Sequence, residues 1–290
     1  MEEVFKSEAG KQEILGKYRE MLDAWPVQNR QYEVATSSGP TFVIESGVSE
    51  NPPLILLHGS MSNSLTWYGD VVTLSKTHHV FAVDMIGEPG LSAPSRPSYE
   101  SGAYPLWLNE IFLALGLKSS AIVGLSLGGW MALSFASQYP EKVEQLVLLC
   151  PGGIAPVSSG LLWKFLFFSL FGKWGEQQIL KMLTGGKVPL EVSPGMEEGL
   201  AFTMLINKHF KPRTAKLPIY TDEALSKLSM PILIICGEYD QLIPAKKSIS
   251  RLKQLAPQTE SVLLPNTGHV VINQAERILD FLTPHTKIVS

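Results

Sequence analysis

The sequence contains little cysteine and few charges, and each shortage argues against a class of protein. Its 290 residues include two cysteines, Cys150 and Cys236, which are too few for a disulfide framework and suit a reducing compartment. We expect two buried free thiols, with a redox role as the alternative. Charged residues make up 18% of the chain and the formal net charge is −3, so no basic field is present to hold a phosphate backbone. No nucleic-acid partner is therefore expected.

Long apolar runs are also missing. The longest run, residues 161–171, spans 11 residues and includes Lys164, whereas a membrane-spanning helix needs about 20. We interpret this run as a buried helix, and a position on a membrane surface or along a pocket is the alternative. Residues 1–20 are charged throughout and lack the apolar core of a signal peptide. The sequence thus predicts a cytoplasmic protein without a transmembrane segment.

The chain does contain enough apolar material for a large core, since hydrophobic residues make up 45% of it. Short apolar runs predict eight strands, at residues 31–35, 41–45, 54–57, 80–83, 121–123, 146–149, 232–235 and 262–264. Helical patterns fall at residues 7–24, 64–75, 104–115, 127–138, 245–255 and 273–282. The later apolar runs are nearly continuous, which is typical of a parallel sheet covered by helices on both faces. Alternating strands and helices therefore predict an α/β fold with right-handed crossovers.

The alternation of strands and helices is interrupted once. Residues 155–220 contain no convincing strand and are rich in Phe, Leu and Trp, so we predict a helical lid inserted between two core strands. The core then comprises residues 1–154 and 221–290, with the helix at residues 7–24 near its start. The apolar side chains of residues 161–171 are too many for one helix face. We expect them to pack the lid and to line an apolar pocket, with packing alone as the alternative.

The sharpest local motif is Gly124-Leu125-Ser126-Leu127-Gly128, which has the form G-x-S-x-G. An apolar run precedes it and a helical pattern follows it, which is the strand–turn–helix context of a nucleophile elbow. Side chains at the two glycines would collide where strand and helix cross. The turn exposes the Ser126 hydroxyl and puts the Leu127 N–H at a helix N-terminus, facing an incoming anion. We predict a nucleophilic Ser126, and a glycine-rich turn without chemistry is the alternative.

A nucleophilic serine needs a base that takes its proton. We expect His269 to be this base, because it follows the apolar run at residues 262–264 and so leaves the C-terminal edge of a strand, where open α/β sheets build their sites. His58 is expected to be structural. His78 and His79 lie before a strand, where we expect them to face solvent. His209 lies in the predicted lid and His285 in the tail.

The base in turn needs an acid that orients it. Asp240 is the candidate, because it lies just past the apolar run at residues 232–235, one strand before the proposed base. Glu238 is the local alternative, and Asp222 and Glu223 are more distant ones.

An oxyanion hole needs a second N–H donor besides that of Leu127. The segment His58-Gly59-Ser60 closes a predicted strand, and its glycine allows the chain to turn back and direct a backbone N–H into the site. Ser60 is the preferred donor. Met61 is the alternative, because one residue of loop register separates the two.

Four separated motifs together resemble the α/β-hydrolase superfamily over residues 30–282. They are residues 58–60, 124–129, 237–240 and 268–269, supported by Asp84-Met85-Ile86-Gly87 and Gly90-Leu91-Ser92. The order serine, aspartate, histidine along the chain is also that of this superfamily. Three further stretches are similar more specifically to bacterial carboxylesterases of the naproxen-esterase type. They are Trp25-Pro26-Val27, residues 56–67 and Tyr220-Thr221-Asp222-Glu223.

The resemblance implies an eight-stranded, mostly parallel sheet with a helical cap, and hydrolysis of carboxylic esters. Carried over residue by residue, it makes Ser126 the nucleophile, His269 the base and Asp240 the orienting acid. It makes the N–H groups of Leu127 and Ser60 the oxyanion donors. One departure is the turn Gly87-Glu88-Pro89-Gly90-Leu91-Ser92, where the family usually reads Gly-His-Gly-x-Ser. We expect the extra residue and the proline to stiffen this loop.

The expected partner is a small-molecule ester with an apolar group, and a homodimer stays open. No residue cluster suggests a metal, and no phosphate-binding glycine motif suggests a nucleotide cofactor, so we expect neither. Hydrolases of carbon–carbon, thioester or lactone bonds share the same three residues, as do cofactor-free perhydrolases. A ligand-binding or signalling protein that turns over little is an alternative of another class, because fold alone does not settle function.

Overall fold

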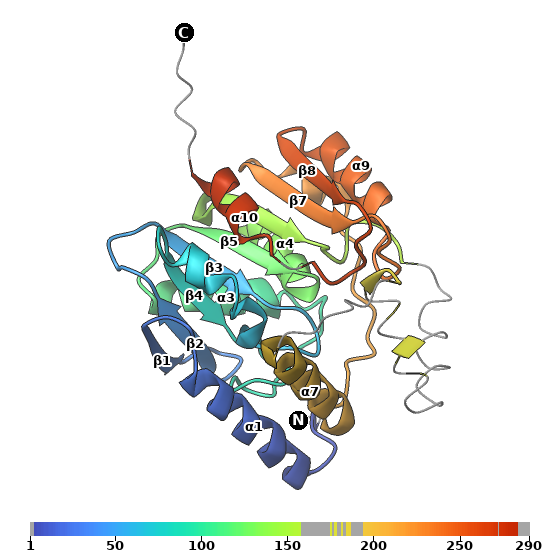
Figure 1. Ribbon diagram of the computed structural model, residues 1–290. Coiled ribbons are helices and arrows are strands. Elements are labelled where there is room, and N and C mark those ends of the chain that lie inside the picture. The colour runs from blue at the N-terminus through green and yellow to red at the C-terminus, as the bar shows by residue number, and fades with distance from the viewer. Residues whose placement is uncertain are drawn as a thin grey trace.

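The computed structural model describes residues 3–157, 175, 177–178, 181, 184–186, 194–271 and 273–283 (Figure 1). The apolar run at residues 161–171 and His285 lie outside the described residues.

One sheet of eight strands forms the centre of the molecule (Figure 1). The strands are β1 (Asn29–Val34), β2 (Thr41–Ser46), β3 (Pro53–Leu57), β4 (His79–Val83), β5 (Ser120–Leu125), β6 (Val143–Leu149), β7 (Ile232–Gly237) and β8 (Thr259–Leu264). Their order across the sheet is β1-β2-β4-β3-β5-β6-β7-β8. β2 pairs antiparallel with β1 and β4, and every later pair is parallel. The predicted fold class is confirmed.

Helices cover both faces of this sheet. In the described residues they are α1 (Glu8–Asp23), α2 (Val71–Leu74), α3 (Ala103–Ala114), α4 (Leu127–Gln138), α7 (Pro194–His209), α8 (Asp222–Ser226), α9 (Ala245–Leu255) and α10 (Ala275–Leu282), with short 3₁₀ turns η1 (Ser64–Trp67) and η2 (Pro140–Lys142). α2 packs against α10, whereas α3, α4, α8 and α9 form a second series of contacts. Within the described part of the chain, no helix is both long enough and apolar enough to cross a membrane.

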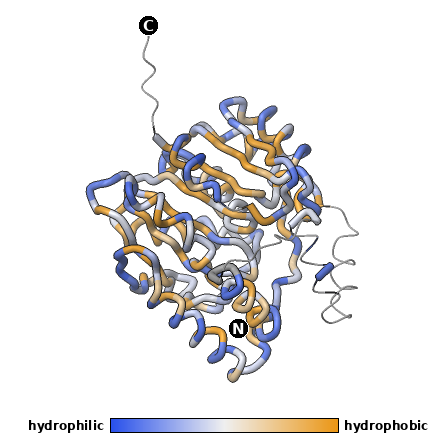
Figure 2. The backbone as a smooth tube through the Cα atoms, in the orientation of Figure 1, coloured by the Kyte–Doolittle hydropathy of each residue, from blue (hydrophilic) through white to orange (hydrophobic). Residues whose placement is uncertain are grey.

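The hydrophobic pattern explains this layering. The central strands β5, β6 and β7 are buried almost throughout, as expected for a parallel sheet with helices on both sides. β1 instead stays exposed or partly exposed except at Val34, and it lies at the edge of the sheet. Figure 2 shows the central strands as continuous hydrophobic segments and the outer turns as hydrophilic ones.

The eight predicted strands and the predicted helices are present, with one difference. The pattern at residues 64–75 forms η1 and the short helix α2 rather than one continuous helix. Gly69 and Asp70 lie at the break, and glycine weakens a helix interior because it exposes the backbone and loses more conformational freedom than other residues.

The expectation that His78 and His79 face solvent is wrong. His78 is buried, and burial lowers the pKa of its imidazole. His79 begins β4, and its Nε2 lies 2.8 Å from a carboxylate oxygen of Glu45 on the neighbouring β2. The sequence around the two histidines is polar, but the contact of His79 with the neighbouring strand is not visible in it.

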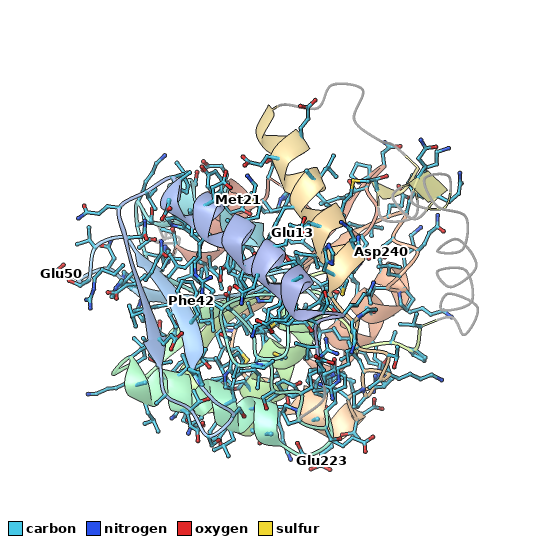
Figure 3. The ribbon with its side chains drawn as sticks, turned by 90° about the horizontal axis from the view of Figure 1, so that it is seen from below. Glu13, Met21, Phe42, Glu50, Glu223 and Asp240 are labelled. Carbon is cyan, nitrogen blue, oxygen red and sulfur yellow. The ribbon has the colours of Figure 1, made fainter. Side chains whose placement is uncertain are left out.

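The N-terminal helix joins the predicted lid region rather than standing apart. α1 and α7 lie side by side in Figures 1 and 3, and the chain continues this contact in an isolated bridge between Phe5 and Phe210. Between β6 and β7 the described residues contain α7 and α8 and no strand. The lid at residues 155–220 stays a prediction, because much of it lies outside the described residues.

Candidate active site

The candidate site is built around a sharp turn between β5 and α4. Ser126 joins the two elements with φ 51° and ψ −105°, a strained conformation for a residue with a side chain. A Cβ added at Gly124 would lie 2.5 Å from the Gly128 carbonyl oxygen, and one added at Gly128 would lie 2.2 Å from the Leu57 carbonyl oxygen. Both glycines are therefore required by close backbone packing, as the sequence predicts.

His269 and Asp240 reach the same turn from the loops after β8 and β7. His269 Nε2 lies 3.1 Å from Ser126 Oγ, and His269 Nδ1 lies 2.8 Å from Asp240 Oδ2. A carboxylate accepts hydrogen bonds only, so Nδ1 carries the proton and Nε2 is left to accept one from the serine. Figure 3 shows Asp240 on the opposite side of the view from Glu50, which lies in the turn before β3.

The carboxylate of Asp240 is held by its own loop. Its side chain is fully buried, and its Oδ1 accepts the N–H groups of Leu242 at 2.8 Å and Ile243 at 2.9 Å. With Oδ2 bonded to His269, both oxygens are occupied. Backbone donors thus fix the direction of the carboxylate, which is what an orienting acid requires.

The pKa of His269 is raised from 6.5 to about 9. Burial opposes the charged imidazolium, but hydrogen bonds and charge–charge interactions with Asp240 and Cys150 outweigh it. Cys150 supports the imidazolium only as a thiolate, and its contact with Cys236 together with its burial raises the pKa of the Cys150 thiol well above its usual value. Asp240 is therefore the group that stabilises the imidazolium whenever His269 takes up a proton.

The alternative acids point elsewhere. Glu238 Oε1 lies 3.9 Å from Lys246 Nζ, whereas the contact of His269 Nδ1 is with Asp240. The two distant alternatives are paired with surface cations, Asp222 with Arg251 and Glu223 with Lys227.

The other described histidines have structural surroundings. His58 is fully buried, with Nδ1 2.8 Å from the Gly59 carbonyl and Nε2 accepting the Met85 N–H at 2.9 Å. His209 ends α7 and lies against Gly10 on α1, with Nε2 3.0 Å from a carboxylate oxygen of Glu13. The contacts of His58 with Gly59 and Met85 fix the starts of the loops after β3 and β4, as expected for a structural histidine.

Two backbone N–H groups are candidates for the oxyanion hole. Leu127 is the first residue of α4, and the first N–H groups of a helix have no partner within it. The loop after β3 lies beside the serine, since a Cβ added at Gly59 would be 3.7 Å from Ser126 Cβ. Met61, the alternative donor in this loop, already donates its N–H to Glu88 Oε2 at 2.7 Å. That contact favours Ser60.

The loop after β3 is fixed by a buried acid that sequence reasoning did not assign. Asp84, at the end of β4, accepts hydrogen bonds from Ser64 N at 2.9 Å, Ser64 Oγ at 2.7 Å, Leu91 N at 2.8 Å and the Tyr18 hydroxyl at 2.8 Å. The sequence offered one signal for this role, because Asp84 belongs to a stretch that carries the family resemblance. Its contact with Tyr18 on α1 is not visible in the sequence.

Cys150 is a second residue whose place near the site was missed. It directly follows β6 with φ 45°, and both cysteines are free and buried, as predicted. The sequence offered one signal for this place, because Cys150 follows a predicted strand at the same edge of the sheet as Asp240 and His269.

Cys150, Asp240 and His269 offer one group of atoms that could hold a metal ion, all within 4.8 Å of one another. Both ring nitrogens of His269 and both oxygens of Asp240 are already engaged in the contacts described above.

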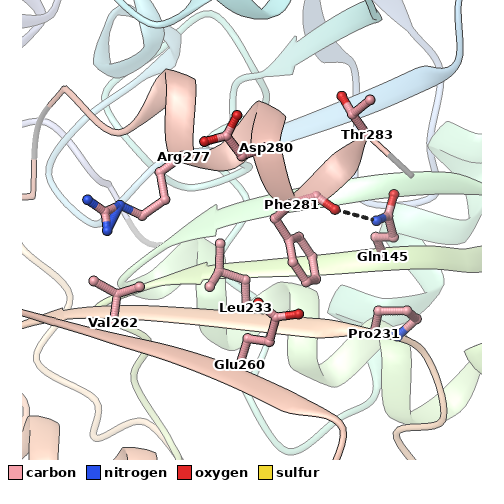
Figure 4. A pocket seen from close by; sticks show the side chains of 9 residues that line it. All are labelled: Gln145, Pro231, Leu233, Glu260, Val262, Arg277, Asp280, Phe281 and Thr283. Atoms are coloured by element: carbon pink, nitrogen blue, oxygen red, sulfur yellow. Dashed lines mark hydrogen bonds between the residues drawn. The ribbon is translucent and has the colours of Figure 1, made fainter. Parts of the chain in front are cut away.

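A separate pocket of about 360 Å³ lies between α10 and the far ends of three strands (Figure 4). Its lining includes Gln145 near the start of β6, Pro231 just before β7 and Phe281 on α10, and Gln145 donates to the Phe281 carbonyl at 2.9 Å. Ser126 lies beyond the opposite end of its strand. The pocket therefore takes no part in the chemistry of the elbow.

Comparison with known proteins defines the class. The family described as the alpha/beta hydrolase fold matches residues 52–275. The chain therefore belongs to the α/β-hydrolase fold family, in agreement with its sheet order and its strand–turn–helix elbow.

Within this family the chain is similar to proteins of Bacillus subtilis. It is 29% identical over 277 residues to the carboxylesterase YbfK of strain 168, covering 91% of this chain and 92% of that protein. The crystal structure of carboxylesterase CesB (YbfK) superposes with a TM-score of 0.80 at 26% identity, covering 94% and 98%. That of naproxen esterase (carboxylesterase NP) gives 0.78 at 26% identity, covering 92% and 96%. The resemblance to this type of carboxylesterase is confirmed.

Proposed function

We propose that this protein is a serine carboxylesterase that works through an acyl-enzyme intermediate. The observation that carries the proposal is the hydrogen-bonded series from Asp240 through His269 to Ser126, with the serine at the apex of the elbow. Relatives that span nearly the whole chain are named carboxylesterases, which supports an ester as the substrate.

In the first half of the reaction, Ser126 Oγ attacks the ester carbonyl while His269 Nε2 takes the hydroxyl proton. Asp240 keeps the imidazole in the tautomer with its proton on Nδ1 and stabilises the imidazolium that forms. The carbonyl oxygen becomes an anion, to which the N–H groups of Leu127 and Ser60 donate. The tetrahedral intermediate then collapses, its bond to the alcohol oxygen breaks, and the imidazolium gives its proton to the departing alcohol.

In the second half, water replaces the alcohol. His269 takes a proton from the water, whose oxygen attacks the acyl carbon, and the same two N–H groups hold the second oxyanion. Collapse of this intermediate releases the carboxylic acid and returns the proton to Ser126. The cycle consumes one water and one ester, and neither a metal nor a redox cofactor takes part in it.

We further propose that residues 155–220 form a lid over a core of residues 1–154 and 221–290. The two ends of this insertion meet beside the elbow. The Gly153 carbonyl accepts the Tyr220 N–H at 2.9 Å, and Trp130 on α4 donates its indole N–H to the Pro218 carbonyl at 3.1 Å. An apolar lid in this position suits a small ester with an apolar group.

The test is steady-state hydrolysis of p-nitrophenyl esters of short and medium acyl chains. We expect robust turnover by the wild type and a loss of about 10⁴-fold or more in Ser126→Ala, because removing the nucleophile leaves only binding and the oxyanion hole. Ser137→Ala, on the far part of the same helix, is the matched control and keeps full activity. Equal activity of Ser126→Ala and the wild type would contradict the proposal. A stoichiometric burst without turnover would favour a ligand-binding protein instead.

A further inference from the structure

Glu88 is a buried acid that the mechanism above does not use. It is 5% exposed and lies in the loop after β4, where the sequence departs from the usual pattern of the family. Its Oε2 accepts the Met61 N–H at 2.7 Å. An ionisable side chain of one loop therefore holds the backbone of another, directly beside the candidate oxyanion hole.

The backbone that Glu88 holds is strained. Met61 has φ 58°, in the left-handed region that residues with a side chain rarely adopt. It follows Ser60, the proposed donor, and Gly59, which lies beside Ser126. A strained residue persists only when its surroundings fix it. The hydrogen bond to Glu88 supplies such a contact and sets the direction of the peptide that joins Ser60 to Met61.

Other contacts fix the later part of the same loop. Asn63 Nδ2 donates to the Pro89 carbonyl at 2.9 Å, and Ser64 donates its N–H and its hydroxyl to Asp84. These bonds hold residues 63–64 against residues 84–91. The bond to Glu88 acts nearer the nucleophile, at the peptide that immediately follows the donor.

The surroundings of Glu88 both oppose and support its charge. The pKa of its carboxyl is raised to about 7, because burial outweighs the opposing effects of the Met61 N–H and of the charges of Arg96 and Arg213. Arg96 donates to the Gly87 carbonyl at 3.0 Å, and the guanidinium of Arg213 lies 3.7 Å from the ring centroid of Tyr99.

The charged and titratable groups that face Glu88 come from its own loop, from α3 and from the segment after α7. They are Arg96, Tyr99, Tyr104 and Arg213. Burial raises the pKa of both tyrosines, and arginine keeps its charge throughout the working range, so Glu88 is the group of this set that titrates near neutral pH.

We propose that Glu88 is a positioning residue for ester hydrolysis: its carboxylate holds the Met61 N–H and thereby directs the Ser60 N–H at the developing oxyanion. The proposal rests on the proposed function. An ionised carboxylate is a stronger acceptor than a neutral one, so protonation of Glu88 loosens the loop without breaking it. Hydrolysis then depends on the ionisation of a residue that never touches the substrate.

Two variants separate the acceptor from the charge. Glu88→Gln keeps an oxygen acceptor for Met61 but has no charge, and Glu88→Leu removes the acceptor at similar size. Losing a whole oxyanion donor typically costs 10²–10³ in turnover, so we expect Glu88→Leu to lower kcat by about 10- to 100-fold with little change in KM. We expect Glu88→Gln to lower kcat by about 3- to 10-fold at pH 8.5. Glu100→Gln, an exposed acid of the same region, is the matched control and keeps wild-type values.

The pH dependence of kcat/KM provides a readout that a merely structural role would not change. His269 titrates in both proteins, so its effect cancels in the ratio of wild type to Glu88→Gln. We expect this ratio to fall toward one as pH drops through about 7, where Glu88 takes up its proton. A trifluoromethyl ketone inhibitor, which forms an oxyanion on Ser126, should lose affinity in Glu88→Leu by the same factor as kcat.

The outcomes are distinct. A ratio that stays constant with pH overturns the proposal, and so does a Glu88→Leu variant with wild-type kcat and inhibitor affinity. If Glu88→Leu fails to fold, the pH ratio of Glu88→Gln still decides. Absence of ester turnover by the wild type overturns the proposed function and this role with it, whereas normal wild-type turnover with unaffected Glu88 variants overturns this role alone.

Discussion

At the scale of single residues, the account depends on the proton between Asp240 and His269. Asp240 is buried and fixed by two backbone N–H groups of its own loop, so its charge is directed at His269 Nδ1. The folded protein therefore binds the imidazole proton more tightly than the unfolded chain does. This contribution to the free energy of unfolding is complete below about pH 6.5 and is lost as pH rises toward about 9.

Asp240→Asn should lower kcat by about 10⁴-fold, because an amide can hold the wrong tautomer of the imidazole. It should also move the acid limb of the kcat/KM profile to lower pH. The carboxylate that raises the pKa of His269 is gone, and burial alone then lowers it. The measurement is a pH profile of ester hydrolysis.

Glu238→Gln is the matched control for this prediction, since it neutralises a neighbouring carboxylate that lies near Lys246 rather than near His269. An acid limb that stays in place in Asp240→Asn, or that moves as far in Glu238→Gln, would show that Asp240 does not set the pKa of the base.

At the scale of elements, the site depends on how closely β5 and α4 cross β3. Gly128, in the first turn of α4, packs against the carbonyl groups at the end of β3 with no room for a side chain. Ser126 adopts its strained conformation at this crossing, and the Leu127 N–H has no partner within α4 because it belongs to the first residue of the helix. The geometry of the nucleophile and of one oxyanion donor therefore follows from one close contact between backbones.

Gly128→Ala should destabilise the protein by about 3 kcal/mol or more, because the new methyl group meets backbone rather than a flexible side chain. Gly16→Ala is the matched control. Gly16 lies within α1 with no atom within 4 Å of an added Cβ, and alanine there should raise the free energy of unfolding by up to about 1 kcal/mol. Urea unfolding curves measure both. Equal stability of the two variants would contradict the close crossing.

At the scale of the whole molecule, the sequence was informative where burial is continuous. The strands β5 to β7 could be predicted because nearly all of their residues face packed helices, and Ser126, Asp240 and His269 could be proposed because each follows one strand of the same sheet edge. The contact between Glu88 and Met61 could not be predicted, since it depends on how two loops 27 residues apart meet in space. The contact of His79 with Glu45 depends in the same way on how β4 pairs with β2.

The two cysteines provide a test of the packed core. Cys150 and Cys236 are buried, and the contact with Cys236 together with burial raises the pKa of the Cys150 thiol well above its usual value. We expect neither thiol to react with Ellman's reagent at pH 8 in the native protein, and both to react after unfolding in guanidinium, because the thiolate is the reactive form. Rapid reaction of either thiol in the native protein would contradict the burial described here.

The central claim is that Ser126 becomes acylated with His269 as its base. The most direct measurement is mass spectrometry of the protein quenched during hydrolysis of a p-nitrophenyl ester, followed by peptide mapping. The account predicts one acyl group per chain on Ser126, no adduct in Ser126→Ala, and slow formation of the adduct in His269→Ala. An acyl group on another residue, or continued turnover by Ser126→Ala without an adduct, would contradict the account.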